Sequence, residues 1–148
     1  MNKKVILSIN LLLGLALIFF SSFDNIEKDV PISISGLRNT KGRVIVQVFR
    51  NEKDYEDQKP FKKLTFDKTG IDNGLITVKL KLEPDAYGFT MVDDENANGT
   101  IDKNFIGIPK EGFGFSNFLM EKMSKPKFGQ FVVDLKILQP VVIKVKYM

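Results

Sequence analysis

Apolar and polar side chains alternate along several short stretches of this chain, the pattern expected of β-strands with one buried face. In Leu75–Leu82 every second residue from the second position is Ile, Val or Leu, and the residues between them are Thr and Lys. Arg43–Phe49 is largely β-branched and apolar on both faces, as expected for a central strand. We therefore predict six or seven strands, and six of them can be placed. They are Val30–Ser35, Arg43–Phe49, Leu75–Leu82, Ala86–Asp93, Phe128–Leu135 and Val141–Tyr147.

Turn-forming residues separate these stretches, for example in Thr69–Gly74 and Asn96–Gly99. Short strands separated by turns at intervals of roughly 8–12 residues are typical of a β-sandwich. No long helical period interrupts them, although Asn51–Phe61 and Phe115–Lys127 each have room for a short helical turn. The pattern predicts an all-β fold: an antiparallel β-sandwich of immunoglobulin-like or transthyretin-like type, with about seven strands.

The N-terminus has the features of an export signal. Lys3 and Lys4 precede the apolar run Val5–Phe20, and small residues follow at Ser21 and Ser22. We expect a signal peptide helix within residues 1–23 and a single β-sandwich domain over residues 24–148. The protein is then exported, and is periplasmic or secreted. In the alternative, residues 5–20 stay uncleaved and anchor the chain to the inner membrane.

Composition excludes several classes of site. The chain has no His and no Cys. It therefore lacks Ser-His and Cys-His nucleophile pairs, the usual zinc, copper and haem ligands, and disulfides. Lys3 and Lys4 account for two of its 22 basic residues, which leaves 20 basic against 18 acidic side chains. This weak excess predicts no nucleic-acid binding, and any membrane contact is expected only through the N-terminal segment.

An acidic loop follows the fourth predicted strand and fits the calcium-loop pattern D-x-[DN]-x-[DN]-G. Alternate residues of such a tightly wound loop point their oxygens inward, toward a cation that takes six to eight oxygen ligands. Phe105 stands where an EF-hand has its bidentate Glu, so Asp93, Glu95 or the more distant Glu111 is expected to complete the shell. The predicted Ca²⁺ ligands are Asp94, Asn96, Asn98, the Thr100 carbonyl, Asp102 and Glu111.

The same loop has a metal-free interpretation. Asn98-Gly99 between two apolar runs is also a strong turn pattern, because both residues tolerate positive φ angles. Asp and Asn side chains stabilise turns by accepting hydrogen bonds from nearby backbone amides. The residues of the loop therefore predict either a weak Ca²⁺ site, with Gly99 at the sharp turn, or a solvated turn.

A glycine- and aromatic-rich segment, Phe105–Phe118, comes directly after the acidic loop. Its aromatic side chains either form an exposed recognition surface, or tuck beneath a loop that covers the open end of the sandwich. In the second case the glycines allow close backbone approach. Glu111 would then reach back to the acidic loop, as a ligand or as a cap.

The stretch "DDENANGTIDKNFIGIPKEGFGFSN", Asp93–Asn117, resembles the signature of the DUF2141 family. Members of this family are exported, mostly bacterial proteins of unknown function. The resemblance implies a β-sandwich-like domain and supplies no assigned reaction. Family members often carry His where this chain has Asp93, which argues against a role that depends on His.

Two classes of function remain. The first is an exported, non-enzymatic β-sandwich module with a Ca²⁺-binding loop over Asp94–Asp102, acting in binding or in envelope structure, with an unknown envelope protein or glycan as its partner. The second is a small carboxylate-dependent hydrolase of glycosidase type. In such an enzyme two carboxylates would serve as acid and base, drawn from Asp93, Asp94, Glu95 and Glu111.

Overall fold

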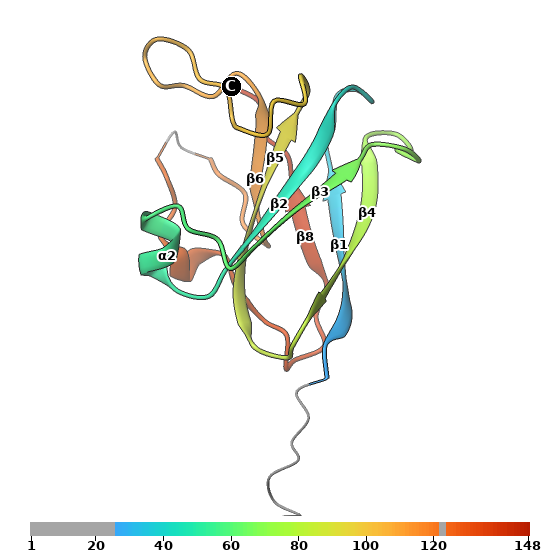
Figure 1. Cartoon of the computed structure of the whole chain (residues 1–148), viewed down its shortest axis with the longest axis vertical. Coiled ribbons are helices and arrows are strands. Elements are labelled where there is room, and N and C mark those ends of the chain that lie inside the picture. Colours follow the sequence, from blue (N-terminus) through green and yellow to red (C-terminus); the bar gives the residue numbers. More distant parts are fainter. Residues whose placement is uncertain (1–25, 122–123) are drawn as a thin grey trace, which may run out of the picture.

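The computed structural model describes residues 26–121 and 124–148, which form two β-sheets packed face to face (Figure 1). The smaller sheet has the strand order β4-β1-β8. Its strands are β1 (Lys28–Ser35), β4 (Leu75–Leu82) and β8 (Val141–Lys144). Strand β1 pairs with β4 in antiparallel and with β8 in parallel orientation.

The larger sheet has five antiparallel strands, with the order β3-β2-β5-β6 and with β7 also paired to β5. Strand β5 is central, because β2 covers one of its edges while β6 and β7 share the other. The strands are β2 (Arg43–Phe49), β3 (Lys62–Asp67), β5 (Ala86–Asp94), β6 (Gly112–Phe115) and β7 (Val132–Asp134).

The main core lies between the sheets and follows the alternation of the strands. Every second residue of β4 is buried, and the residues between them are exposed. The two sheets also meet directly at one side. Phe113 and Lys146 exchange backbone hydrogen bonds of 3.0 and 2.8 Å, and these join β6 to the residues that follow β8. Gly112 and Gly114 permit this contact, because a Cβ atom at either position would collide with that segment.

A second apolar cluster covers the outer face of the larger sheet. Its buried members are Phe49, Tyr55, Phe113, Phe115, Met120 and Phe131. Helix α2 (Glu52–Glu56) and the 3₁₀ turn η1 (Phe128–Gln130) lie over this face (Figure 1). Asn51 caps the N-terminus of the helix, because its side chain accepts a 2.9 Å hydrogen bond from the Asp54 amide.

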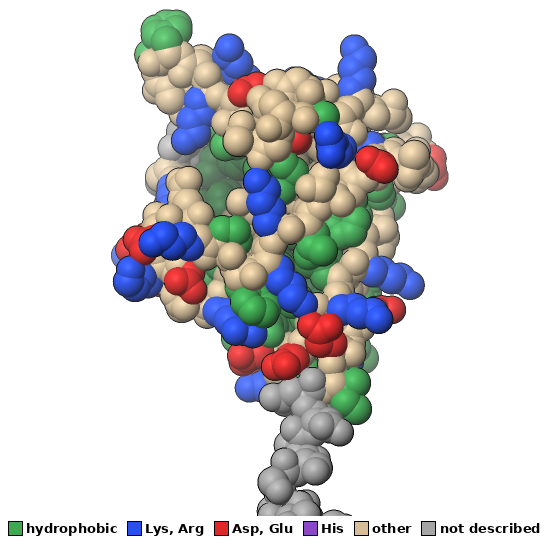
Figure 2. All heavy atoms as spheres, in the orientation of Figure 1, with side chains coloured by type: hydrophobic (Ala, Val, Ile, Leu, Met, Phe, Trp, Pro, Cys, Tyr) green, Lys and Arg blue, Asp and Glu red, His purple; other side chains and the backbone are tan. Residues whose placement is uncertain are grey.

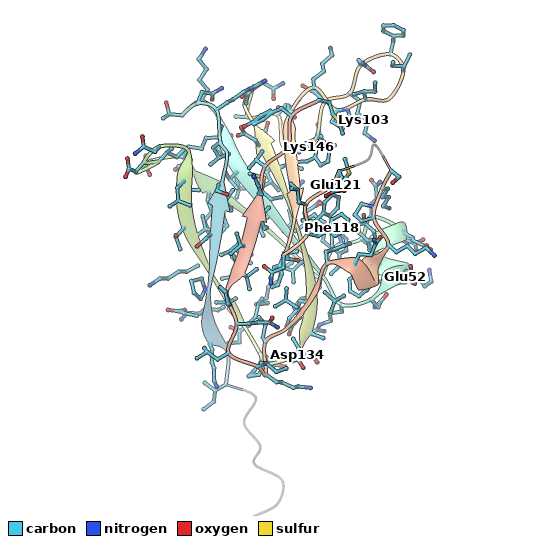
Figure 3. All side chains as sticks on the ribbon, turned by 180° about the vertical axis from the view of Figure 1, so that it is seen from behind. Glu52, Lys103, Phe118, Glu121, Asp134 and Lys146 are labelled. Atoms are coloured by element: carbon cyan, nitrogen blue, oxygen red, sulfur yellow. The ribbon has the colours of Figure 1, made fainter. Side chains whose placement is uncertain are left out.

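The C-terminal segment holds the connection after β6 in place. Lys146 donates from Nζ to the backbone carbonyls of Met120, at 2.8 Å, and Glu121, at 3.5 Å. Figure 3 shows Lys146, Glu121 and Phe118 in one region of the molecule. Among the described residues, no helix has the length and apolar character needed to cross a membrane.

The β-sandwich prediction is confirmed, with corrections of detail. Residues 26–121 and 124–148 form eight strands, and the β1–β8 pair is parallel. Of the predicted strand Phe128–Leu135, the first residues form η1 and only Val132–Asp134 pairs as a strand. Strands β3 and β6 were not predicted. The expected signal peptide lies outside the described residues.

Candidate functional site: the acidic loop and its surroundings

The acidic loop begins at the end of β5 and leads toward β6, at the same end of the sandwich as the C-terminus (Figure 1). Asp94, the last residue of β5, is buried on the outer side of the sheet and organises the start of the loop. Its Oδ1 accepts a 3.0 Å hydrogen bond from the Asn98 amide, and its Oδ2 accepts one of 2.9 Å from the Gly99 amide. Gly99 has φ +82°, so the chain turns back here in a conformation that suits glycine.

Asp102 holds the opposite side of the loop. Its Oδ2 accepts a 2.6 Å hydrogen bond from Asn96 Nδ2, and its Oδ1 accepts one of 3.1 Å from Asn98 Nδ2. Asn98 Oδ1 in turn accepts from the amide of Thr100 at 2.9 Å and from its hydroxyl at 3.1 Å. The five predicted ligand positions within the loop are therefore brought together in one hydrogen-bonded unit.

Glu111, the sixth predicted position, is only 4% exposed and reaches the loop from the residue before β6. Its Oε1 accepts from the Glu95 amide and its Oε2 from the Asp102 amide, each at 3.0 Å. Glu111 thus ties the two ends of the loop together. Within residues 26–121 and 124–148, no group of three or more His, Cys, Asp or Glu side chains is arranged to hold a metal ion. Oxygens for a cation would come from Asp94 and Asp102 together with amide and backbone groups.

Replacing Glu111 by Ala is expected to loosen the loop and to destabilise the protein by about 1–2 kcal/mol, because two partly buried amides lose their acceptor. Hydrogen exchange should show faster exchange at the amides of Glu95 and Asp102, and thermal unfolding should give the loss of stability. Glu56→Ala, at an exposed position of α2, is the matched control. Unchanged exchange at both amides would contradict the capping role.

A buried charge network lies beneath the loop, and sequence reasoning did not predict it. Asp93 is 0% exposed, and its Oδ1 forms an ion pair with Lys68. Its Oδ2 accepts a 2.5 Å hydrogen bond from the Tyr147 hydroxyl. Burial of the Tyr147 side chain is the main cause that raises its pKa, and the hydrogen bond to Asp93 raises it further. The only hint in the sequence is a lone Lys just after β3, which does not reveal a partner 25 residues away.

Glu95 is held on the loop surface by the turn that precedes β2. Its carboxylate accepts two hydrogen bonds from Arg38, Nε to Oε1 at 2.7 Å and Nη2 to Oε2 at 2.5 Å. Asn39 Nδ2 adds a third, of 2.6 Å. The Arg38 guanidinium holds the pKa of Glu95 below its usual range. Arg38 also lies over the Tyr147 ring, 4.3 Å from its centre, and so connects the surface pair to the buried network.

The four carboxylates considered as acid–base residues are all engaged in contacts with the protein itself. Asp93, Asp94, Glu95 and Glu111 each accept hydrogen bonds from neighbouring protein groups. Asp93 faces the interior beside Lys68, whereas Glu95 faces outward beside Arg38. The arrangement is suited to holding the loop on the sandwich.

Some aromatic side chains of the segment Phe105–Phe118 are buried and others are exposed, so each of the two interpretations made from the sequence describes part of the segment. Phe113 and Phe115 lie in β6 and pack into the second apolar cluster, and Phe118 packs partly against it. They cover the outer face of the larger sheet, and this corrects the expectation of a loop over the open end of the sandwich. Phe105 is 99% exposed, at the tip of the connection between β5 and β6.

One comparison with known proteins identifies a relationship. The DUF2141 family model, described as "Uncharacterized protein conserved in bacteria", matches residues 32–140. This range includes most of the strands, the acidic loop and Glu111. No curated protein and no solved structure matches the chain significantly.

Proposed function

Because the chain belongs to the DUF2141 family, whose description assigns no activity, we propose a function from its own residues: an exported, non-enzymatic β-sandwich module whose acidic loop binds Ca²⁺. The role of such a module is in binding or in envelope structure, with an envelope protein or a glycan as its partner.

One observation carries the Ca²⁺ proposal. The Asp102 carboxylate lies within hydrogen-bonding distance of both the Asn96 and the Asn98 side-chain amides. Their N–H groups occupy the Asp102 lone pairs that a cation would use. Ca²⁺ would displace these donors. Both amide groups would then rotate, so that the Asn96 and Asn98 side-chain oxygens leave the Asn98 and Thr100 backbone amides and bind the ion with Asp102 and the Thr100 carbonyl. With few carboxylates the affinity is weak, on the order of 10⁻⁴ to 10⁻³ M as in extracellular modules.

Asp94 and Glu111 support the same site in a different way. Both residues accept hydrogen bonds from loop amides through both carboxylate oxygens. These hydrogen bonds hold the loop in its wound conformation in the absence of a cation, so less conformational entropy is lost when the cation binds. Asp94 and Glu111 complete the coordination shell only through lone pairs that the backbone amides leave free.

The proposed location rests on the N-terminal segment. Lys3 and Lys4 followed by the apolar run Val5–Phe20 support export. The protein then works in the periplasm or outside the cell, or is anchored to the inner membrane by residues 5–20. Extracellular free Ca²⁺ reaches millimolar concentrations, which suits a loop of this expected affinity.

The experiment is calorimetric unfolding of the purified protein in EDTA and in millimolar Ca²⁺ at matched ionic strength. Mass action predicts stabilisation by about 1.4 kcal/mol at ten times Kd and about 2.7 kcal/mol at one hundred times Kd. Asp102→Asn should abolish most of this shift while leaving the Asp94 and Glu111 hydrogen bonds in place. Asp29→Asn, at an exposed position of β1, is the matched control and should keep the full shift.

A melting temperature of the unsubstituted protein that does not respond to Ca²⁺ would leave the loop as a metal-free turn. An equal Ca²⁺ response in Asp102→Asn and in the unsubstituted protein would place the ion elsewhere.

A further inference from the structure

A groove lies on the outer face of the larger sheet, next to the acidic loop, whose residues Gly99 and Thr100 form part of its lining. Its floor is formed by outward-facing residues of β2, β5 and β6, including Gln47, Val92 and Phe113. The loop between β5 and β6 forms one wall, and Met120 and Lys125 form another. The cavity measures about 820 Å³. Figure 2 shows it as a hollow with apolar side chains at its base.

The size and lining of the groove are typical of a small-molecule site. Such sites are usually about 300–1,000 Å³ and mostly apolar, with a few polar groups. Phe113 and Phe115 offer ring surfaces, and Ile101 and Ile108 offer aliphatic surface on the loop wall. The polar side chains of Gln47 and Thr90 bond to each other at 3.2 Å on the floor. These two side chains therefore keep each other as hydrogen-bond partners when an apolar ligand covers the floor.

Within the described residues, the charged side chains that line the groove are all basic. Lys63, Lys103 and Lys125 line it, and no Asp or Glu in the described part of the chain does. Lys63 Nζ donates one hydrogen bond to the Gly99 carbonyl, at 2.8 Å, and Lys125 Nζ donates one to the Tyr55 carbonyl, at 3.4 Å. An ammonium group has three donors, so both lysines keep donors for an anion. Lys103 stands on the loop between β5 and β6 (Figure 3).

We propose that this groove binds a small amphiphilic carboxylate of the fatty-acid type. Its hydrocarbon chain lies over Phe113 and Phe115, where it is removed from water, and its carboxylate is held by the lysines of the rim. Apolar surface alone would accept any amphiphile. The three lysines, which share the lining with no Asp or Glu of the described residues, select an anionic amphiphile, because a positively charged headgroup would be repelled there.

The test is isothermal titration calorimetry of the purified protein with dodecanoate, below its micelle concentration and in EDTA. EDTA prevents calcium soaps and makes the result independent of the Ca²⁺ proposal. Saturable binding of dodecanoate is expected, with dodecyltrimethylammonium at least ten-fold weaker. Equal binding of both amphiphiles would overturn the proposal, because it would indicate apolar adsorption without charge selection. Tighter binding of dodecyl phosphate than of dodecanoate would overturn the assignment of the headgroup.

Two variants test the charges. Lys63→Met together with Lys103→Met is expected to weaken dodecanoate binding at least ten-fold. The matched control replaces two exposed lysines of β4, in the other sheet, as Lys79→Met with Lys81→Met, and should bind like the unsubstituted protein. Equal weakening in both double variants would overturn the role of the groove lysines.

The location is tested with a single tryptophan, since the chain contains none. Ile106→Trp places the ring at the edge of the groove, and Val142→Trp places it on β8 in the other sheet. Dodecanoate should shift the emission of the first variant and leave that of the second unchanged. A shift in both variants, or in neither, would overturn the assignment to this groove.

Discussion

Replacing Lys68 by Met is expected to destabilise the protein by about 3–5 kcal/mol, the usual cost of leaving one member of a buried ion pair without its partner. The Lys68 and Asp93 side chains are each 0% exposed. Without the ammonium group, the Asp93 carboxylate keeps only the Tyr147 hydroxyl as a side-chain partner. It must then remain charged in an apolar surrounding or take up a proton, and both alternatives cost free energy.

Denaturant unfolding measures this loss, and a second substitution isolates its cause. In the double variant Lys68→Met with Asp93→Asn, both charges are gone and residue 93 can still accept the Tyr147 hydrogen bond. Most of the lost stability should return. Lys53→Met is the surface control: Lys53 pairs with Asp57 at 2.7 Å, but its side chain is 80% exposed, so a change below about 1 kcal/mol is expected. Equal instability of the single and double Lys68 variants would show that the unpaired Asp93 charge is not the source of the lost stability.

Replacing Gly114 by Ala is expected to cost about 3 kcal/mol, at the upper end of what overpacking usually costs. A Cβ at this position would lie 2.5 Å from Ile143 Cγ2 and 2.8 Å from the Lys144 carbonyl oxygen. Neither atom is the free end of a flexible side chain, so relief requires β8 and β6 to move apart. That movement would strain the contacts that join the two sheets at this side.

Gly129→Ala is the matched control, because nothing lies within 4 Å of a Cβ built there. Thermal unfolding of the two variants should therefore show a large loss for Gly114→Ala and a small change for Gly129→Ala. Similar melting temperatures would mean that the β6–β8 junction can widen at little cost.

The sequence predicted strands where the alternation of side chains was intact. Strands β2 and β4 appear with the predicted bounds. The sequence of β6, Gly-Phe-Gly-Phe, predicts a loop, because glycine is depleted in strands. Its alternation is nevertheless that of a strand, with Phe on the outer face and Gly toward β8. Glycine is required there because β8 and the residues after it pack directly against β6. A sequence pattern does not reveal this contact between remote segments.

The candidate site shows the same division. Asp94, Asn96, Asn98, Thr100 and Asp102 lie within nine residues of chain, and their spacing predicted that they would gather in one loop. Glu111 was named as a possible partner, and its hydrogen bonds to the Glu95 and Asp102 amides depend on the antiparallel pairing of β5 with β6. Lys68, Tyr147 and Arg38 gave no sequence pattern, because their partners are 25 to 57 residues away along the chain.

Features that depend on short-range geometry or composition can be predicted from the amino-acid sequence: the two-residue period of the strands, the glycine turn of the acidic loop and the absence of His and Cys chemistry. The pairing of the buried charges, the face of β6 that approaches β8 and the position of the lysines around an apolar groove become visible only in the folded protein. The difference comes from distance along the chain. Backbone conformation and side-chain alternation are set by near neighbours, whereas ion pairs, close sheet contacts and cavities arise only when the sheets pack and bring remote segments together.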